Sequence, residues 1–202
     1  MEDMLYSEKE IAIFNGLMDL MKKGANTYSI KVSDIAEAAN IGKGTIYDYF
    51  NSKEEAISEA ILYSLTNEIE SGYARIQSKD SFKEKFYETL YTVSESVENN
   101  IATLNMLLSV GGVQEFYEYL LDDRDELSKC ISRVNNVIEH LLEAGICEGI
   151  IDTTESHYYQ VMAVYSAVMG FAQYVSRKVL YPGTSEEEAM EAAYRLVTKA
   201  LN

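Results

Sequence analysis

The sequence predicts an all-α protein, in which a small three-helix domain at the N-terminus is joined to a larger helical bundle. Proline occurs only once in 202 residues, at Pro182, whereas residues that favour helices are abundant. No segment shows the apolar–polar alternation of a β-strand. Four serines are each followed three residues later by glutamate, the pattern of a capping box at a helix start. These pairs are Ser7–Glu10, Ser52–Glu55, Ser81–Glu84 and Ser185–Glu188.

The first quarter of the chain predicts three of these helices. One is expected from about Ser7 to Lys23, and Gly24 follows where a glycine commonly ends a helix. Its apolar face would consist of Ile11, Phe14, Met18 and Met21. Two short helices follow at 32–39 and 43–50, joined by the turn Asn40-Ile41-Gly42, in which asparagine tolerates left-handed backbone geometry. This arrangement is typical of a helix-turn-helix unit.

The rest of the chain predicts a helical bundle. Starting at Ser52, about six further helices are expected, with breaks near residues 78–81, 111–112, 143–156 and 181–185. No flexible linker precedes this part. We therefore expect a helix-turn-helix domain over residues 1–52 and a second domain over residues 53–202, joined directly by the helix that starts at Ser52.

The composition excludes several other classes of protein. The N-terminus, MEDMLYSEKE, lacks the apolar core of a signal peptide, and no run reaches the roughly 18 apolar residues of a membrane span. Cys130 and Cys147 are too few for a disulfide framework or a zinc site. We therefore expect a cytoplasmic protein that has no membrane partner, no bound metal and no cofactor.

Negative charge is concentrated in the second part of the chain. The net charge is −16, but residues 1–53 contain six Lys/Arg and eight Asp/Glu, so they contribute only −2. An acidic surface repels nucleic acid. Any contact with DNA must therefore come from a small local surface of the N-terminal domain.

The segment 43–50 has two different faces when it is drawn as a helix at about 100° per residue. Ile46 and Phe50 fall on an apolar face that would pack against Ile35, Ala36 and Ala39. The opposite face carries Gly44, Thr45, Asp48 and Tyr49. On these residues alone, a helix that contacts DNA and a structural turn packed against the rest of the chain are equally well supported.

Several residues of this segment have the chemistry that DNA contacts require. Lys43 would lie at a helix N-terminus, where backbone N–H groups favour a phosphate. Gly44 permits close approach of the backbone, and Thr45 can donate to phosphate or offer its methyl group to thymine. Tyr47 adds a hydroxyl donor on a rigid ring. Lys53 is unfavourably placed for the dipole of the next helix, which a phosphate partner would explain.

The stretch "VSDIAEAANIGKGTIYDYFNSKEEAISEAI", residues 32–61, resembles the DNA-binding signature of the TetR family of bacterial transcriptional regulators. The matching elements are Asp34-Ile35-Ala36, Ala39, Lys43-Gly44-Thr45, Tyr47, Phe50 and Ser52-Lys53-Glu54. They occur in order and at the family's spacing. A weaker match, "LLEAGICEGIID" at residues 141–152, resembles the loop before the family's penultimate long helix.

The resemblance implies an all-α homodimer whose two helix-turn-helix units read a palindromic operator in double-stranded DNA. It implies DNA contacts from Lys43, Gly44, Thr45, Tyr47, Tyr49 and Lys53, with a contribution from Ser33. Lys31 stands where the family usually has a capping serine or threonine, and it adds a charge that could reach phosphate. Asp48 has the wrong sign for phosphate, so it either accepts from a cytosine amino group or lies outside contact.

The resemblance also implies that the second domain binds a small-molecule effector and forms the dimer. The segment 157–181 is apolar nearly all round, which predicts burial on most sides, and the segment 186–201 has alanines on one face that allow close approach. The resemblance implies that these two helices form the dimer interface. The alternative is that they only close the core of one subunit. Candidate effector-binding residues are Phe86, Met106, Tyr117, Asn135, Tyr159, Met162, Tyr165 and Met169, which include flexible and aromatic side chains typical of apolar pockets. His140 is a further candidate, although a packed or surface histidine is the plainer interpretation.

These observations favour a ligand-responsive repressor whose effector is small and either apolar or cationic. An enzyme is disfavoured, because two histidines, two scattered cysteines and no phosphate-binding loop yield no catalytic constellation, and we expect no catalytic residues. The remaining alternative is a helical module that binds small molecules or proteins without specific DNA binding.

Overall fold

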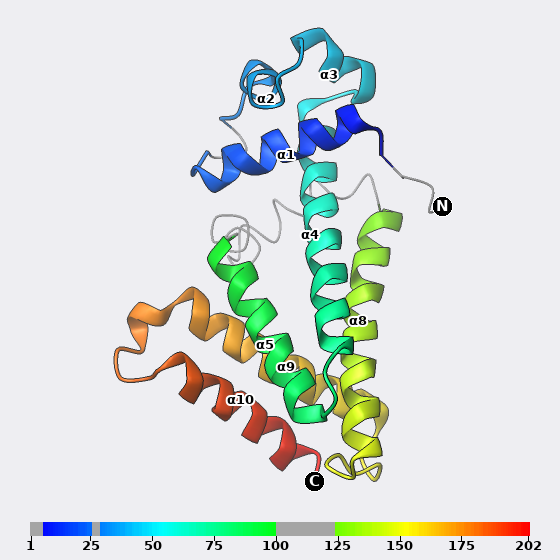
Figure 1. Ribbon diagram of the computed structural model, residues 1–202, viewed down its shortest axis with the longest axis vertical. Coiled ribbons are helices and arrows are strands. Elements are labelled where there is room, and N and C mark those ends of the chain that lie inside the picture. The colour runs from blue at the N-terminus through cyan, green and yellow to red at the C-terminus, as the bar shows by residue number, and fades with distance from the viewer. Residues whose placement is uncertain (1–5, 26–28, 100–123) are drawn as a thin grey trace. The chain divides into compact units, whose positions relative to one another are not determined.

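The computed structural model describes residues 6–25, 29–99 and 124–202, and every regular element in these ranges is helical. The elements are α1 (Glu8–Lys22), α2 (Val32–Ala38), α3 (Lys43–Tyr49), α4 (Lys53–Gln77), α5 (Phe82–Asn99), α8 (Arg124–Cys147), α9 (His157–Ser176), the 3₁₀ turn η1 (Lys178–Leu180) and α10 (Glu186–Ala200). Figure 1 labels these helices along the chain. The predicted all-α fold is confirmed.

The chain divides into two compact units, which are described separately below. The first contains the residues up to Asn67 and also the start of α8, whereas the second contains Glu68–Asn99 and Ile131–Asn202. Helix α4 begins in the first unit and ends in the second. The expected division at residues 52 and 53 stays a prediction.

The capping serines begin helices as predicted. Ser7 and Ser185 each accept from the backbone N–H three residues later, and the glutamate at that position accepts from the serine N–H. Ser81 and Glu84 exchange the same two bonds, at 3.3 and 3.0 Å. At Ser52 only half of the box forms. The Ser52 hydroxyl accepts from the Glu55 N–H at 3.0 Å, but the Glu55 carboxylate accepts from the backbone N–H of Asn51 instead of that of Ser52.

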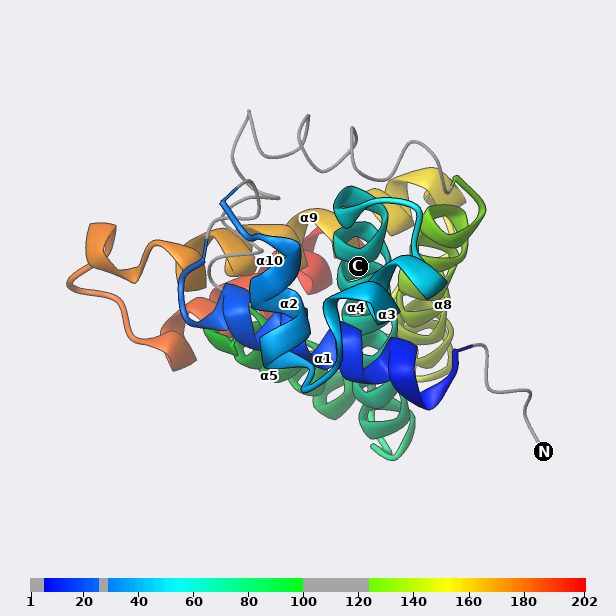
Figure 2. The same cartoon turned by 90° about the horizontal axis from the view of Figure 1, so that it is seen from above.

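The first unit is built around α1. Its core contains Ile13, Phe14 and Leu17 of α1 together with Ile46 and Phe50, all at most 2% exposed. Figures 1 and 2 both place α2 and α3 on the same side of α1. This close packing needs Gly16, because a Cβ atom there would lie 2.9 Å from the backbone nitrogen of Ala39.

The turn between α2 and α3 has the geometry that its sequence predicts. Asn40 has a φ of 53°, the left-handed conformation that asparagine tolerates better than most residues. Gly24 after α1 also has a positive φ, of 86°, as expected for a glycine that ends a helix. The three-residue turn fixes how α3 follows α2, so the predicted helix-turn-helix is confirmed.

In the second unit, α9 packs against both α5 and α10. Its buried face carries Val164, Ala167, Phe171 and Val175. A polar network holds the end of this helix pair: the Glu186 carboxylate accepts from the Ser94 hydroxyl at 2.6 Å and from the Lys178 ammonium at 2.8 Å. These bonds tie α5, η1 and α10 together.

Candidate functional site

The exposed face of α3 is the first candidate site. Tyr47 and Tyr49 are 55% and 36% exposed, and Lys43, Gly44 and Asp48 are also exposed. Thr45 is half-buried. This face is directed outward because Ile46 and Phe50 insert into the core of the first unit. The structure therefore brings together on one short helix the polar and aromatic residues predicted from the wheel.

The flanking candidate residues already have partners within the chain. The Asp34 carboxylate accepts from the Lys31 backbone N–H at 3.0 Å and from the Ser33 hydroxyl at 3.2 Å. Asp34 therefore supplies the carboxylate half of a capping box, no side chain at position 31 caps the helix, and the Lys31 side chain is left exposed. Lys53 is half-buried at the start of α4 and forms an ion pair with Glu54 at 3.6 Å.

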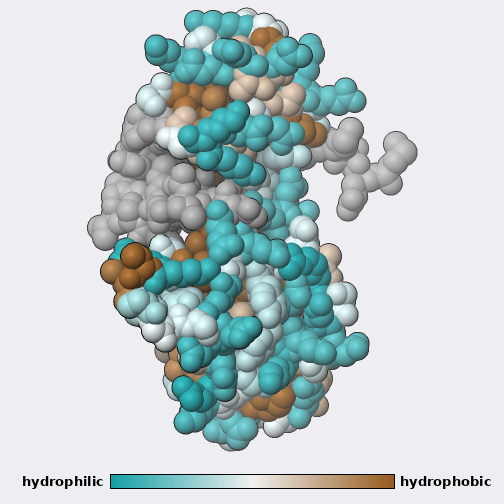
Figure 3. Space-filling model, turned by 60° about the vertical axis from the view of Figure 1, so that its left-hand side comes forward, coloured by the Kyte–Doolittle hydropathy of each residue, from teal (hydrophilic) through white to brown (hydrophobic). Residues whose placement is uncertain are grey.

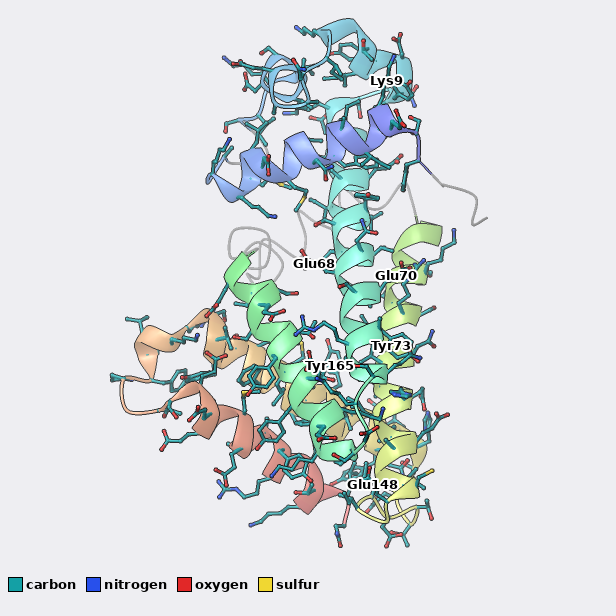
Figure 4. The ribbon with its side chains drawn as sticks, in the orientation of Figure 1. Lys9, Glu68, Glu70, Tyr73, Glu148 and Tyr165 are labelled. Carbon is teal, nitrogen blue, oxygen red and sulfur yellow. The ribbon has the colours of Figure 1, made fainter. Side chains whose placement is uncertain are left out.

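The second candidate site is a partly open cavity of about 220 Å³ within the second unit. Four helices wall it: α4, α5, α8 and α9. Its described lining residues are Ile69, Gly72, Tyr73, Ile76, Thr89, Thr92, Val93, Val134, Val137, Ile138, Leu141, Tyr165, Val168 and Met169. Figure 4 shows Tyr73 of α4 and Tyr165 of α9 among the side chains between these helices.

Two of the residues predicted to bind the effector, Tyr165 and Met169, line this cavity. Phe86 instead belongs to an aromatic cluster with Phe82 and Tyr194, at centroid distances of 6.0 and 5.8 Å. Three further candidates are not among the lining residues: Asn135 and Met162 are exposed, and Tyr159 is half-buried. Met106 and Tyr117 lie outside the described residues.

Most of the lining was not predicted from the sequence. Ile69, Gly72, Tyr73 and Ile76 of α4 recur at the spacing of one helix face, which was the available signal. That signal identifies a packed face, but it does not distinguish a face that borders a cavity from one that meets another side chain.

His140 lies beside the cavity wall. Its ring makes an edge-to-face contact with Tyr73 at a centroid distance of 5.7 Å, and its buried Nε2 has no hydrogen-bond partner among the described residues. Burial lowers the pKa of His140 below its ordinary value, and the nearby Lys85 charge lowers it further. The imidazole is therefore kept neutral at neutral pH.

One face of α9 stays uncovered in the single chain. Tyr158, Met162 and Tyr165 are 76%, 43% and 49% exposed, and Leu196 of α10 is 54% exposed. Hydrophilic residues dominate the face seen in Figure 3, where hydrophobic residues form separate patches. Large contiguous apolar patches on a protein surface commonly mark interaction sites.

Comparisons with known proteins agree with this architecture. Residues 25–60 match the family model described as "Bacterial regulatory proteins, tetR family". No curated protein matches the sequence significantly. Among solved structures, the fatty acid degradation regulator FadR from Bacillus halodurans is 16% identical with a TM-score of 0.70, and the alignment covers 96% of each chain.

Two further structures show the same similarity. A TetR transcription regulator from Haloarcula marismortui is 16% identical with a TM-score of 0.71, over 98% of this chain and 100% of that one. FadR from Bacillus subtilis, solved in complex with stearoyl-CoA, is 17% identical with a TM-score of 0.63, over 95% and 97% of the two chains. Matches at this identity concern the fold.

A helix-turn-helix unit followed by a helical body is the architecture that this chain shares with the solved TetR-family regulators. The family-model match over residues 25–60 and the full-length structural similarity confirm the resemblance to the TetR family. The chain has the fold of TetR-family transcriptional regulators, a family of regulators rather than enzymes. In the described part of the chain, no helix is long and apolar enough to cross a membrane.

Proposed function

We propose that the chain is a transcriptional repressor that binds a palindromic operator as a homodimer and is released by a small-molecule effector. The observation that carries this proposal is the outward display of Lys43, Tyr47 and Tyr49 on a short helix anchored by Ile46 and Phe50. A helix presented in this way can enter the major groove, while its flanks contact phosphates.

The proposed DNA surface is small because the chain as a whole is acidic. Lys43, Gly44, Thr45 and Tyr47 contact bases or phosphates, and Tyr49 contacts the backbone. The flanks, with Lys31, Ser33 and Lys53, supply further phosphate contacts. Asp48 is exposed on the same helix, and we propose that it either reads a cytosine amino group or lies outside contact.

The homodimer is supported by the uncovered apolar residues of α9 and α10. Met162, Tyr165 and Leu196 remain between 43% and 54% exposed in the single chain. A two-fold pairing of these helices would cover them and place two recognition helices for two half-sites. The apolar cavity supports the effector, and one structural neighbour, FadR from Bacillus subtilis, was solved with stearoyl-CoA.

The test is a fluorescence-anisotropy titration of the purified protein with DNA from its own upstream region, repeated over a range of salt. We expect a 2:1 protein–DNA complex whose affinity falls as salt rises. Lys43→Ala or Tyr47→Ala should weaken specific binding by about 1–3 kcal/mol, which is roughly 5- to 150-fold. Lys199→Ala, which removes the same charge from an exposed position on α10, is the matched control.

Two outcomes would contradict the proposal. Specific binding that is unchanged in both Lys43→Ala and Tyr47→Ala would exclude α3 as the DNA-contacting helix. An absence of binding to any upstream fragment at low salt and without effector would favour the alternative, a helical ligand-binding or protein-binding module without specific DNA binding.

A further inference from the structure

We infer that the cavity of the second unit selects an uncharged, hydrocarbon-like molecule of about nine non-hydrogen atoms, rather than a cationic or anionic one. This inference rests on the proposed function, because it takes the cavity to be the effector site. Three features of the described residues carry it: the chemistry of the wall, the pairing of the neighbouring charges, and the volume.

The wall of the cavity is almost wholly carbon. None of the described lining residues is charged, and most are aliphatic. The two threonine hydroxyls are turned to their own helix: Thr89 donates to the Lys85 carbonyl and Thr92 to the Glu88 carbonyl, both at 2.9 Å. The remaining polar groups are the hydroxyls of Tyr73 and Tyr165, and these residues present mainly ring carbon to the cavity.

Charged groups on the neighbouring helix faces are already paired. The buried Lys85 ammonium donates to the backbone carbonyls of Ile76, Gln77 and Lys79, the last at 2.6 Å. The Glu88 carboxylate accepts from Arg75 at 2.6 Å and pairs with Lys79 at 3.1 Å. A charged ligand would have to break such pairs or remain uncompensated.

Among the described residues, two neighbours have spare hydrogen-bonding capacity: Arg133, and His140, whose neutral ring could pair with a hydroxyl but offers no charge to balance an ion. The Arg133 Nε donates to the Glu70 carboxylate at 2.9 Å, whereas its buried Nη1 has no partner in the part of the chain that the structure describes. The Glu70 charge opposes the approach of a second carboxylate to the same guanidinium. An ion seated against this wall would therefore lose part of its hydration without gaining a partner of opposite charge, which is unfavourable.

The volume limits the size of the ligand. An engineered apolar cavity of about 150 Å³ stays dry and binds benzene. Scaling that example to the 220 Å³ found here gives a ligand of about nine non-hydrogen atoms. Sites for drug-sized molecules are larger, about 300–1,000 Å³.

The test compares three eight-carbon probes that differ in charge: octan-1-ol, octylammonium and octanoate. Their dissociation constants are measured by isothermal titration calorimetry on the full chain without DNA. We expect octan-1-ol to bind at least tenfold more tightly than either ion. Equal or tighter binding of octanoate or octylammonium would overturn the inference, as would tighter binding of stearoyl-CoA than of octan-1-ol.

Cavity-filling variants test whether the binding occurs at this site. Val137→Phe should weaken octan-1-ol binding at least tenfold, whereas Val179→Phe, the same change at a side chain that is 86% exposed, should leave it unchanged. Val134→Leu fills less of the cavity and serves if Val137→Phe does not keep its helical circular dichroism spectrum. Unchanged affinity in both filled variants would overturn the inference.

The effect of octan-1-ol on DNA binding is measured separately. If octan-1-ol binds selectively in the cavity but never changes DNA affinity, the preference of the cavity stands and the proposed effector role fails. If the protein binds DNA but the three probes do not differ, the proposed repressor stands and the inference about the ligand fails.

Discussion

Replacing Gly72 with alanine tests how closely α4 and α5 approach each other at the cavity wall. A Cβ atom added at Gly72 would lie 2.5 Å from Cγ2 of Thr92, far inside the roughly 3.5–4.0 Å of a favourable carbon–carbon contact. The Thr92 side chain cannot rotate freely, because its hydroxyl donates to the Glu88 carbonyl at 2.9 Å. The added methyl group must therefore displace a helix or break that hydrogen bond.

Two opposing effects set the magnitude. Inserting a methyl group into a packed contact costs about 1–3 kcal/mol, while alanine is favoured over glycine in a helix by roughly 1 kcal/mol. We expect Gly72→Ala to range from neutral to about 2 kcal/mol destabilising. Thr92→Ser removes Cγ2 and keeps the hydroxyl, and the next atoms, Oγ1 and Cβ, lie at ordinary distances of 3.5 and 3.6 Å.

In the Thr92→Ser background, Gly72→Ala should therefore be neutral to about 1 kcal/mol stabilising. The difference between the two backgrounds is a coupling energy of about 1–3 kcal/mol. Urea unfolding of the four proteins, followed by helical circular dichroism, measures it. The same effect of Gly72→Ala in both backgrounds would refute the close contact. Gly170→Ala, where no atom lies within 4 Å of the added Cβ, should behave alike in both backgrounds.

Three further predictions follow from other parts of the chain. Gly16→Ala places a Cβ against the backbone of Ala38 and Ala39 at 3.0 and 2.9 Å. After the helix preference of alanine is subtracted, it should destabilise the first unit by up to about 2 kcal/mol and weaken DNA binding in the anisotropy titration. Gly44→Ala meets no atom within 4 Å and should keep the thermal unfolding midpoint, and equal midpoints for both variants would contradict the packing argument. Because the pKa of His140 is lowered in the folded chain, the unfolded chain binds more protons below about pH 6.5. The free energy of unfolding should therefore fall as the pH drops through this range. In His140→Gln, the urea midpoint should depend less on pH between pH 7 and 5. A pH profile that is identical in His140→Gln would exclude this source. Lys85→Met leaves carbonyls at and just after the end of α4 without their donor, so it should lower the free energy of unfolding in urea by about 2–3 kcal/mol. The control Lys199→Met, at an exposed position, should unfold with a free energy within about 0.5 kcal/mol of the parent.

Local rules were sufficient to predict the helix-turn-helix unit. A capping serine, a glycine or asparagine that accepts left-handed geometry, and an apolar repeat each act over a few residues. Asn40 and Gly24 have the positive φ angles expected of them, and Ile46 and Phe50 are buried as the wheel indicates. The family signature adds order and spacing, which is why the fold could be recognised from about thirty residues.

The cavity could not be predicted in the same way, because it depends on which helix faces meet. Phe86 and Tyr165 are both aromatic residues on apolar helices, so the sequence gives them equal weight as pocket residues. In the structure, Phe86 is fully buried among other rings, whereas Tyr165 borders the cavity and is half exposed. Gly72 was not predicted at all, because the packing of α5 against it is a tertiary contact.

Helix α4 contributes residues both to the core of the first unit and to the wall of the cavity. Ala56, Ile57 and Ile61 belong to the core of the first unit, while Ile69, Tyr73 and Ile76 of the same helix line the cavity. A ligand shifts an equilibrium only by the difference between its affinities for the two states. A molecule that fits the cavity equally well in the DNA-binding and the released states would bind without releasing DNA. Within a series of alcohols, affinity for the cavity alone should therefore not predict how strongly each alcohol weakens DNA binding.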